Sequence, residues 1–339
     1  MSAADRDPHV HDVVIVGAGL AGLVAATALA ADGADVVLLD KSRSAGGRLA
    51  TRRVEGATLD HGAQFFTVRS EAFAGLLEAW RAAGMPVRAW SHGLPQAPSV
   101  AAGPAAVDIP ADGHPRYIVD GGMNALAQHL AERLEVRERR RVSRADAVDG
   151  RWRISVEGLR AREVVEGRRL LLTPPVPQSL ALLPPDAPRA EELTDLGYAP
   201  CVSLLAVLSA PPALPWPGGV QIADGPIGWL ADNQRKGLSV RPALTAHATD
   251  AESTVLADLD DATAAARLGS HVAPWLGDGR PVAVHVKRWR YARPLLPHPE
   301  RAVSTDVDGA LLVFAGDAFG EARVEGAARS GLAAAERLA

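Results

Sequence analysis

Cysteine is nearly absent from this chain of 339 residues, which contains one, Cys201. A single cysteine excludes an internal disulfide and any cysteine-rich metal site. Its neighbours in the segment CVSLLAVL are apolar, and such surroundings favour a small buried hydrophobic side chain over a nucleophile. The sequence therefore predicts no catalytic thiol and no metal site.

A net positive charge is absent, and long hydrophobic runs are scarce. The formal net charge is −4 at pH 7, and the arginines between residues 133 and 144 have no interleaved aromatic residues, so nucleic acid is not an expected partner. Gly, Asp or Pro interrupts each long apolar segment well short of a membrane span. Residues 1–11 lack the basic and apolar pattern of a signal peptide. We therefore expect a cytoplasmic protein without a membrane partner, and the oligomeric state stays open.

The most informative stretch is residues 12–40, which has the pattern of a complete βαβ unit. Residues 13–16 form a β-branched run typical of a strand buried on both faces of a parallel sheet. An Ala-rich apolar helix follows, Gly33 ends it, and residues 36–39 form a second apolar run. A glycine fingerprint alone is weak evidence in a chain with 32 glycines, but here strand, helix, second strand and a final acidic residue agree.

Three glycines and one carboxylate give this unit its expected chemistry. Gly17, Gly19 and Gly22 have the G-x-G-x-x-G spacing, in which the first permits the turn, the second lets a pyrophosphate approach and the third packs helix on strand. Asp40 stands where a ribose hydroxyl acceptor belongs, and its charge repels a 2′-phosphate. The unit therefore predicts FAD or NAD rather than NADP.

The segment KSRSAGGRLATRR follows directly. Its Gly46 and Gly47 open the backbone again, and Arg48 can reach the phosphates. A basic surface loop is the alternative interpretation, but next to the βαβ unit this segment favours FAD.

A second glycine turn lies in the segment LDHGAQFFT. Gly62 and Ala63 are small enough for a flavin ring to lie against the backbone, and Gln64 can hydrogen-bond near it. His61 receives no catalytic role, because a turn histidine with satisfied hydrogen bonds is the commoner case.

The middle of the chain predicts short strands and helices around a second domain. Gly- and Pro-rich residues 84–116 indicate irregular strands, and residues 135–173 indicate an antiparallel meander in which Val142 ends the first strand and Thr173 the last, both near the cofactor. The other predicted elements are helices at 71–83, 124–134 and 261–275 and strands at 201–208, 228–232, 243–249 and 282–289. Gln64 is also a candidate for a pocket that holds a flat substrate. Four further candidates, for each of which plain packing is the commoner role, are Trp229, His247, Trp289 and Tyr291.

The C-terminal stretch repeats the pattern of strand, turn and helix. Residues 311–315 predict a buried strand, Gly316 and Asp317 a turn that carries a carboxylate, and Val324 the start of an Ala-rich helix. Asp317 would bind a ribityl hydroxyl, and the helix N-terminus at residues 324–327 would favour an anionic reduced flavin. A simple NAD enzyme needs no such unit.

The motifs GAGLAGL, LLDKSRSAGGRLATRR, DHGAQFFT, KRWRYARP and FAGDAFGEARVEGAARSGLAAA together resemble bacterial renalase-like proteins, within the flavin amine oxidase superfamily. The resemblance covers both ends and scattered central points, whereas residues 84–116 and 174–225 match only in general character. It implies an α/β fold in which a Rossmann-like FAD-binding domain is interleaved with a smaller α+β substrate domain that contains a mixed or antiparallel sheet. The expected boundaries are 1–72, 117–176 and 286–339 for the FAD-binding domain, and 73–116 and 177–285 for the substrate domain.

The resemblance also implies an activity. Such proteins hold FAD noncovalently and oxidise 2- or 6-dihydro isomers of NAD(P) to NAD(P)⁺, with O₂ as the electron acceptor and H₂O₂ as the product. No acid or base is needed, because an N-alkylated dihydropyridine becomes aromatic when it loses hydride. An amine oxidase or desaturase of the same superfamily, or a non-catalytic FAD-binding protein, stays as an alternative. Amine-oxidising relatives tend to present a tyrosine cage and a lysine, whereas this chain has three tyrosines and Lys287 has no assigned place.

The residues expected to contact FAD come from the motifs and from the resemblance together. Relatives often have Glu in place of Asp40, and the shorter side chain keeps both acceptor oxygens. The full set is Gly17, Gly19, Leu20, Ala21, Gly22, Asp40, Lys41, Gly47, Arg48, Gly62, Ala63, Gln64, Val142, Thr173, Gly316, Asp317, Val324 and Ala327.

Overall fold

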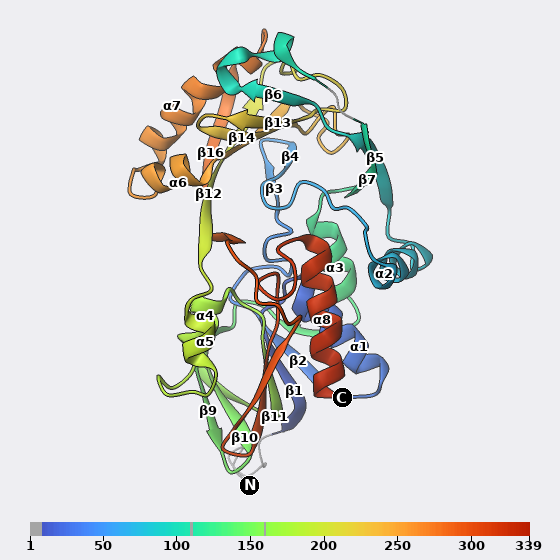
Figure 1. Cartoon of the computed structure of the whole chain (residues 1–339), viewed down its shortest axis with the longest axis vertical. Helices are drawn as coiled ribbons and strands as arrows, with labels where there is room; N and C mark the ends of the chain where they lie inside the picture. The colour runs from blue at the N-terminus through green and yellow to red at the C-terminus, as the bar shows by residue number, and fades with distance from the viewer. Residues whose placement is uncertain (1–8, 109–110, 159–160) are drawn as a thin grey trace. The chain divides into compact units, whose positions relative to one another are not determined.

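The computed structural model of the chain describes residues 9–108, 111–158 and 161–339 (Figure 1). Residues 1–8, part of the segment without a signal pattern, and residues 109–110, within the Gly- and Pro-rich stretch, lie outside the described residues. Contacts within the chain define two compact units. The first unit comprises Met1–Gly47, Leu126–Gly197 and Pro294–Ala339, and the second comprises Arg48–Ala125 and Tyr198–Arg293.

The first boundary lies after residue 47, earlier than the expected 72. Residues 48–72 include a hairpin of β3 (Thr51–Val54) and β4 (Ala57–Asp60). This hairpin forms hydrogen bonds with residues 239–241 of the same second unit. The Thr58 N–H donates to Ser239 Oγ at 3.2 Å, and the Arg241 guanidinium donates to Glu55 O at 2.6 Å. The units thus differ in extent from the expected domains, and the assignment of FAD to one and substrate to the other stays a prediction.

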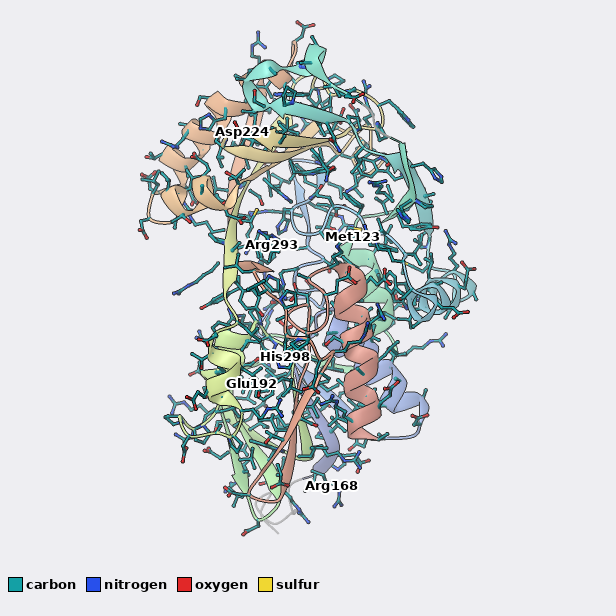
Figure 2. All side chains as sticks on the ribbon, in the orientation of Figure 1. Met123, Arg168, Glu192, Asp224, Arg293 and His298 are labelled. Carbon is teal, nitrogen blue, oxygen red and sulfur yellow. The ribbon has the colours of Figure 1, made fainter. Side chains whose placement is uncertain are left out.

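Residues 177–197 belong to the first unit rather than to the expected substrate domain. They contain α5 (Ala190–Thr194), and Figure 2 shows Glu192 of this helix beside His298, whose Nε2 lies 2.8 Å from the Glu192 carboxylate. The Ala145 N–H donates to Leu182 O at 2.8 Å. Hydrogen bonds therefore hold this proline-rich stretch in the first unit, and the chain crosses over at residue 198.

The first unit is built on a mixed sheet in the order β17-β18-β11-β1-β2-β8, extended by β10 and β9. The pairs β1–β2, β1–β11, β2–β8 and β11–β18 are parallel, as the βαβ pattern predicts. Residues 13–16 are at most 7% exposed, which confirms a strand covered on both faces. The strand bounds are β1 Val10–Val16, β2 Val36–Leu39, β8 Glu135–Arg137, β9 Arg141–Val148, β10 Arg151–Glu157, β11 Arg162–Leu172, β17 Val303–Val307 and β18 Ala310–Phe314.

Two helices of the first unit, α1 (Leu20–Ala31) and α8 (Val324–Leu338), pack against each other (Figure 1). A Cβ at Gly331 of α8 would lie 2.4 Å from the Ala21 carbonyl oxygen of α1, so glycine permits this close approach. The predicted ends agree with the structure, since Gly33 with φ +86° follows α1 and α8 begins at Val324. This unit also contains α4 (Val176–Leu180) and most of α3 (Asn124–Ala131). The first two residues of α3 belong to the second unit.

The predicted meander differs from the structure at its first strand. Residues 135–142 do not form one strand, because β8 ends at Arg137 and β9 begins at Arg141. Arg139 with φ +54° makes the turn between them, and its N–H donates to Ser42 O at 2.8 Å. Val142 therefore lies at the start of β9 instead of the end of a strand, while β9, β10 and β11 form the expected antiparallel meander.

The second unit contains a sheet in the order β16-β12-β15-β14-β13-β6 and the hairpins β3–β4 and β5–β7. Its main hydrophobic core includes the buried Trp275. The sequence predicts one helix over 261–275, whereas the structure has α7 (Asp261–Val272) followed by the short η3 (Ala273–Trp275). The strand bounds are β5 Val87–Gly93, β6 Gln96–Ser99, β7 Ala111–Val119, β12 Tyr198–Leu208, β13 Gly219–Asp224, β14 Ile227–Asp232, β15 Ala243–Ala248 and β16 Pro281–Pro294. The helices α2 (Glu71–Ala82) and α6 (Asp250–Leu256) and the short η1 (Val100–Ala102) and η2 (Pro104–Ala106) complete it. Across the described ranges, no helix combines the length and hydropathy needed to cross a membrane.

Candidate functional site

The residues that follow four parallel strands of the first unit meet at one edge of its sheet. Gly17 follows β1, Asp40 follows β2, Thr173 follows β11, and Gly316 comes two residues after β18. The carboxyl ends of parallel strands share an edge, which is where open α/β sheets bind ligands. We call this edge the strand-end cradle.

The three glycines of the first turn have three different surroundings. A Cβ at Gly17, where φ is +99°, would lie 2.5 Å from Thr173 Oγ1, and a Cβ at Gly22 would lie 2.2 Å from Gly17 O. A Cβ at Gly19 would meet nothing within 4 Å. Gly17 and Gly22 are therefore required by the fold itself, whereas the space at Gly19 is open to a ligand.

The start of α1 presents backbone donors beside this space. Gly19 is the N-cap, and no side chain caps the helix. The first N–H groups of a helix, here those of Leu20 and Ala21, have no partner within it, and together with the helix dipole they attract anions. The loop that ends at Gly47 folds back beside the turn, since the Gly46 N–H donates to Ala18 O at 2.8 Å and a Cβ at Gly47 would lie 3.4 Å from the Gly19 Cα.

Asp40 is fixed at the rim of the cradle and is 9% exposed. Its Oδ2 accepts the Ala18 N–H at 2.8 Å and its Oδ1 accepts the Ser42 N–H at 2.7 Å. Each carboxylate oxygen keeps a further lone pair for a ligand hydroxyl. The Arg140 N–H donates to Asp40 O at 2.8 Å, which brings the start of β9 and Val142 to the same end of β2.

Thr173, Gly316 and Asp317 form the far side of the cradle. The Thr173 hydroxyl lies 2.9 Å from Val16 O and 3.0 Å from Gly17 O, so it holds the glycine turn. The Gly316 N–H donates to Ser330 Oγ of α8 at 2.8 Å, and Asp317 beside it is partly exposed. Arg323, the N-cap of α8, makes no side-chain capping bond, so the N–H groups at Val324 and its successors are a second set of helix-end donors.

The remaining predicted cofactor residues have other surroundings. Lys41 Nζ donates to Gln178 Oε1 at 3.0 Å on the surface of the first unit. In the second unit, Arg48 Nη1 donates to Ala292 O at 3.3 Å, and a Cβ at Gly62 would lie 2.0 Å from Arg48 O. Glycine is therefore required at position 62 because the backbone of residues 48–50 packs against it. The sequence indicates a different reason, the approach of a flavin ring. The Ala63 N–H donates to the same Arg48 oxygen at 2.9 Å.

A buried ion pair anchors the second unit's segment 60–65. Asp60 Oδ2 lies 2.8 Å from Lys236 Nζ, and the two side chains are 1% and 0% exposed. Asp60 Oδ1 accepts the Thr51 hydroxyl at 2.6 Å and the Met123 N–H at 3.0 Å. Sequence reasoning missed this pair, because 176 residues separate its members and the only signal is that a buried lysine needs a counter-charge.

His61 and Trp289 stack at 5.5 Å between ring centroids. Trp289 Nε1 donates to His61 O at 2.8 Å, which connects β16 to the end of β4. Burial, assisted by the nearby Lys287 charge, lowers the pKa of His61 to about 4. The imidazole is therefore neutral at pH 7, and its buried Nδ1 has no hydrogen-bond partner among the described residues.

Gln64 lies beside His247, with 3.4 Å between Gln64 Nε2 and His247 Nε2. Gln64 Nε2 also donates to Asp60 O at 2.9 Å, while its buried Oε1 has no partner in the described part of the chain. Burial, the neighbouring His61 imidazole and the charge of Lys236 lower the pKa of His247 to about 4, so this histidine is also neutral at pH 7.

Trp229, on β14, lies next to His247 of the neighbouring strand β15. It pairs with His247 in the β14–β15 register, and its ring contacts Phe65 at 5.7 Å and Trp90 at 6.4 Å. Its buried Nε1, too, lacks a partner within the residues described. We call the set His61, Gln64, Phe65, Trp90, Trp229, His247 and Trp289 the aromatic cluster.

Two other residues that the sequence singled out lie in the second unit. Tyr291 makes an edge-on contact with Tyr198, with 5.6 Å between ring centroids. Burial raises the pKa of the Cys201 thiol to about 11, so it stays protonated at neutral pH, in keeping with the apolar segment around it.

Comparisons with known proteins identify related families and folds. Residues 15–80 match the NAD(P)-binding Rossmann-like domain, and residues 99–339 match the family described as flavin containing amine oxidoreductase. The chain is 51% identical over 61 residues to hydroxyneurosporene desaturase of Rubrivivax gelatinosus and 48% identical over 52 residues to lysine-specific histone demethylase 1 homolog 3 of Oryza sativa subsp. indica. These matches span 18% and 15% of this chain but only 12% and 6% of those proteins.

Among solved structures, putrescine oxidase bound to putrescine matches with a TM-score of 0.72. The match covers 98% of this chain and 99% of that chain at 18% identity. At this identity the likeness is one of fold.

Proposed function

This chain belongs to the flavin containing amine oxidoreductase family, and from that premise we propose that it is an FAD-dependent oxidase of 2- or 6-dihydro isomers of NAD(P). The family is one of flavoenzymes, and FAD is the cofactor. The dihydropyridine ring would lose a hydride from one C–H bond to flavin N5, and O₂ would take up two electrons and two protons to give H₂O₂. The product is NAD(P)⁺.

The residues of the strand-end cradle fit FAD. The open space at Gly19 and the uncapped start of α1 would receive the pyrophosphate, and the free lone pairs of Asp40 would accept a ribose hydroxyl. FAD, when bound, supplies the two-electron acceptor of the reaction. The Asp317 turn and the start of α8 would hold the ribityl and ring end.

The observation that carries the substrate assignment is that the aromatic cluster holds neutral side chains and that the cation beside it, Lys287 Nζ, lies 4.5 Å from the centre of the Trp289 ring. His61 and His247 are neutral at pH 7 because each pKa lies at about 4, and the Asp60 carboxylate is already paired with Lys236. The Lys287 charge would repel an ammonium substrate, whereas the ring of a dihydronicotinamide is flat and uncharged.

Two buried polar atoms of the cluster lack partners among the described residues and have the chemistry to bind a carboxamide. Gln64 Oε1 would accept a hydrogen bond from its NH₂ group, and Trp229 Nε1 would donate one to its oxygen. The flat rings would hold the dihydropyridine by stacking. The loss of hydride leaves an aromatic pyridinium ring, so these residues need to orient the substrate and exclude water without abstracting a proton.

Oxidation of an amine, or desaturation of a carbon skeleton, is the second candidate function. Its support is the fold shared with putrescine oxidase and the local identity to a desaturase. A non-catalytic FAD-binding protein is the third, because the cradle by itself requires no turnover.

An anaerobic titration of the purified flavoprotein distinguishes these candidates. A mixture of dihydro-NAD isomers, with pure 4-dihydro-NADH as the control, is added while the visible flavin bands are followed. We expect rapid bleaching by the mixture alone, return of the colour in air, and one H₂O₂ per substrate oxidised.

Bleaching by 4-dihydro-NADH alone would make the protein a flavin reductase and overturn the proposal. Bleaching by a primary amine or a diamine, with no response to the isomers, would establish the amine oxidase. Bound flavin that no donor reduces would indicate the non-catalytic protein.

A further inference from the structure

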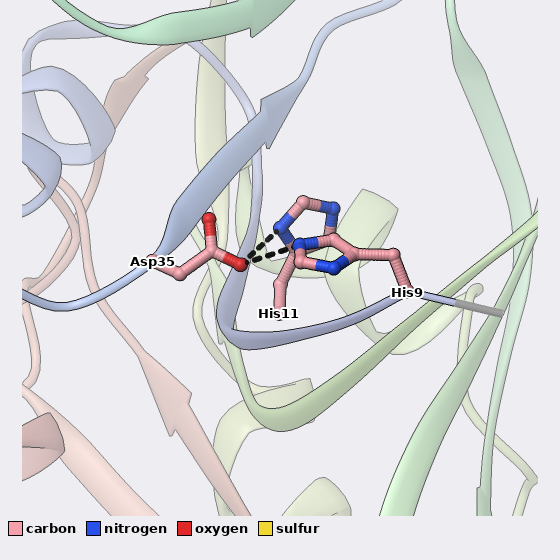
Figure 3. A group of neighbouring side chains, drawn as sticks. All are labelled: His9, His11 and Asp35. Atoms are coloured by element: carbon pink, nitrogen blue, oxygen red, sulfur yellow. Dashed lines mark hydrogen bonds and ion pairs between the residues drawn. The ribbon is translucent and has the colours of Figure 1, made fainter. Parts of the chain in front are cut away.

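Three metal-ligating side chains meet at the edge of the first unit's sheet opposite to the strand-end cradle. His9 directly precedes β1, His11 lies on β1, and Asp35 directly precedes β2. His9 Nε2 and His11 Nδ1 lie 2.8 Å and 2.9 Å from the same oxygen, Asp35 Oδ2, as both dashed lines in Figure 3 show. The three potential ligand atoms lie within 4.8 Å of one another.

The backbone holds these side chains in place. Residues two apart along a strand point to the same face, so the two histidine rings lie together, with 4.5 Å between their centroids. The carbonyl of Asp35 accepts the N–H groups of Asp12 at 3.0 Å and Val13 at 3.2 Å, and its own N–H donates to Asp12 Oδ2 at 3.0 Å. The carboxylate therefore stands on a loop that is fixed against β1.

We propose that His9, His11 and Asp35 bind a divalent zinc ion, with water as the fourth ligand. Two imidazoles and one carboxylate are a donor set for zinc and similar transition metals rather than for Mg²⁺ or Ca²⁺, which prefer oxygen ligands. Tetrahedral ligands at zinc lie about 3.3 Å apart, so the two histidine–carboxylate distances need to lengthen by about 0.5 Å. The two imidazole nitrogens, which lie within 4.8 Å of each other, need to approach by no more than about 1.5 Å. The sequence predicts no metal site, and it carries no local signal for this one because Asp35 lies 24 residues from His11.

The exposure of the three side chains suits a site that ions can enter. His11 is 3% exposed and forms the floor, whereas His9 and Asp35 are 71% and 43% exposed. β1 has seven residues, so the ion would lie about 23 Å along the strand from the Gly17 turn. At that distance the metal takes no part in flavin chemistry, and its effect is to tie the start of β1 to the loop before β2. The proposal is thus independent of the proposed function.

Isothermal titration with ZnCl₂ tests the site on untagged, flavin-loaded protein that has been treated with EDTA and desalted. We expect one zinc per chain and a rise in the melting temperature, with no change in the flavin spectrum. Asp35→Asn keeps the shape of the side chain and removes its charge, and His9→Ala changes an exposed residue, so both variants should fold. Each should weaken zinc binding at least tenfold and abolish the thermal shift.

The matched control is His129→Ala, which removes a histidine from another histidine–carboxylate pair of the same unit, 3.9 Å from Glu132. Zinc affinity in this variant should equal that of the parent. The proposal is overturned if the parent binds no zinc at micromolar concentrations, or if Asp35→Asn and His9→Ala bind it as tightly as the control.

Discussion

The strand-end cradle and the aromatic cluster are built in opposite ways. The cradle is made mostly of backbone, and its glycines and Asp40 come from one stretch of the sequence, residues 17–47, with short additions after β11 and β18. The aromatic cluster is made of side chains, and the segment 60–65 meets residues from β5, β14, β15 and β16. A backbone site tolerates changes of surface side chains, whereas a side-chain site depends on the buried contacts that position it.

The largest expected effect is at the ion pair that supports the cluster. Lys236→Met leaves the Asp60 carboxylate buried without its partner, and we expect a loss of about 3–5 kcal/mol in the free energy of unfolding. Urea denaturation measures it. The double variant Asp60→Asn with Lys236→Met removes both charges and should recover most of the loss; a double variant as unstable as the single one would contradict this account.

The next effect is a dependence of stability on pH. The pKa of His61 and of His247 is about 4 in the folded chain and about 6.5 when unfolded. Below pH 6.5 the unfolded chain binds more protons than the folded chain. The contribution of the two neutral histidines to the free energy of unfolding is therefore fully present above pH 6.5. It falls as the pH drops from 6.5 to 4, by at most roughly 3 kcal/mol per histidine.

Urea unfolding at pH 7.5 and 5.0 measures this slope. His61→Gln should flatten it, whereas His92→Gln, at an exposed histidine, should leave it unchanged. Equal slopes in the parent and in His61→Gln would show that burial of His61 does not carry the effect.

A pair of glycine variants separates fold from ligand in the cradle. Gly22→Ala places a Cβ 2.2 Å from Gly17 O, so we expect a loss of about 2 kcal/mol in stability. Gly19→Val places its Cβ in open space, so the apoprotein should lose no more than about 1 kcal/mol, the cost of valine at an N-cap, while FAD affinity should fall at least tenfold. Flavin fluorescence and thermal melting measure both quantities, and a Gly19→Val protein that still purifies yellow would exclude pyrophosphate from this position.

The smallest expected effect concerns one acceptor in the cluster. Gln64→Leu removes the unpartnered Oε1, and we expect kcat/KM for the dihydro-NAD isomers to fall about tenfold, or ~1.4 kcal/mol, the value of one hydrogen bond. FAD affinity, measured in parallel, separates the two roles expected for Gln64: a lower kcat/KM at unchanged FAD affinity places it at the substrate, and weaker FAD binding alone places it at the cofactor. An unchanged kcat/KM would remove Gln64 from substrate recognition.

The sequence by itself determined the parts of this protein that depend on local rules. Strand period, helix ends and the glycine turn follow from residues within 30 positions of one another, so β1, α1, β2 and the start of α8 lie where they were predicted. The positions of Gly17, Gly19 and Gly22 are readable because backbone geometry restricts which residue can occupy them.

Only the tertiary structure decided which distant side chains meet. It placed residues 48–72 in the second unit, moved Val142 to the start of a strand, paired Asp60 with Lys236 and brought Asp35 to the two N-terminal histidines. A single sequence carries no local signal for such pairs, because long-range hydrogen bonds and the desolvation of charges are settled when the chain packs. The cradle could therefore be predicted from the sequence, and the aromatic cluster could be recognised only in part.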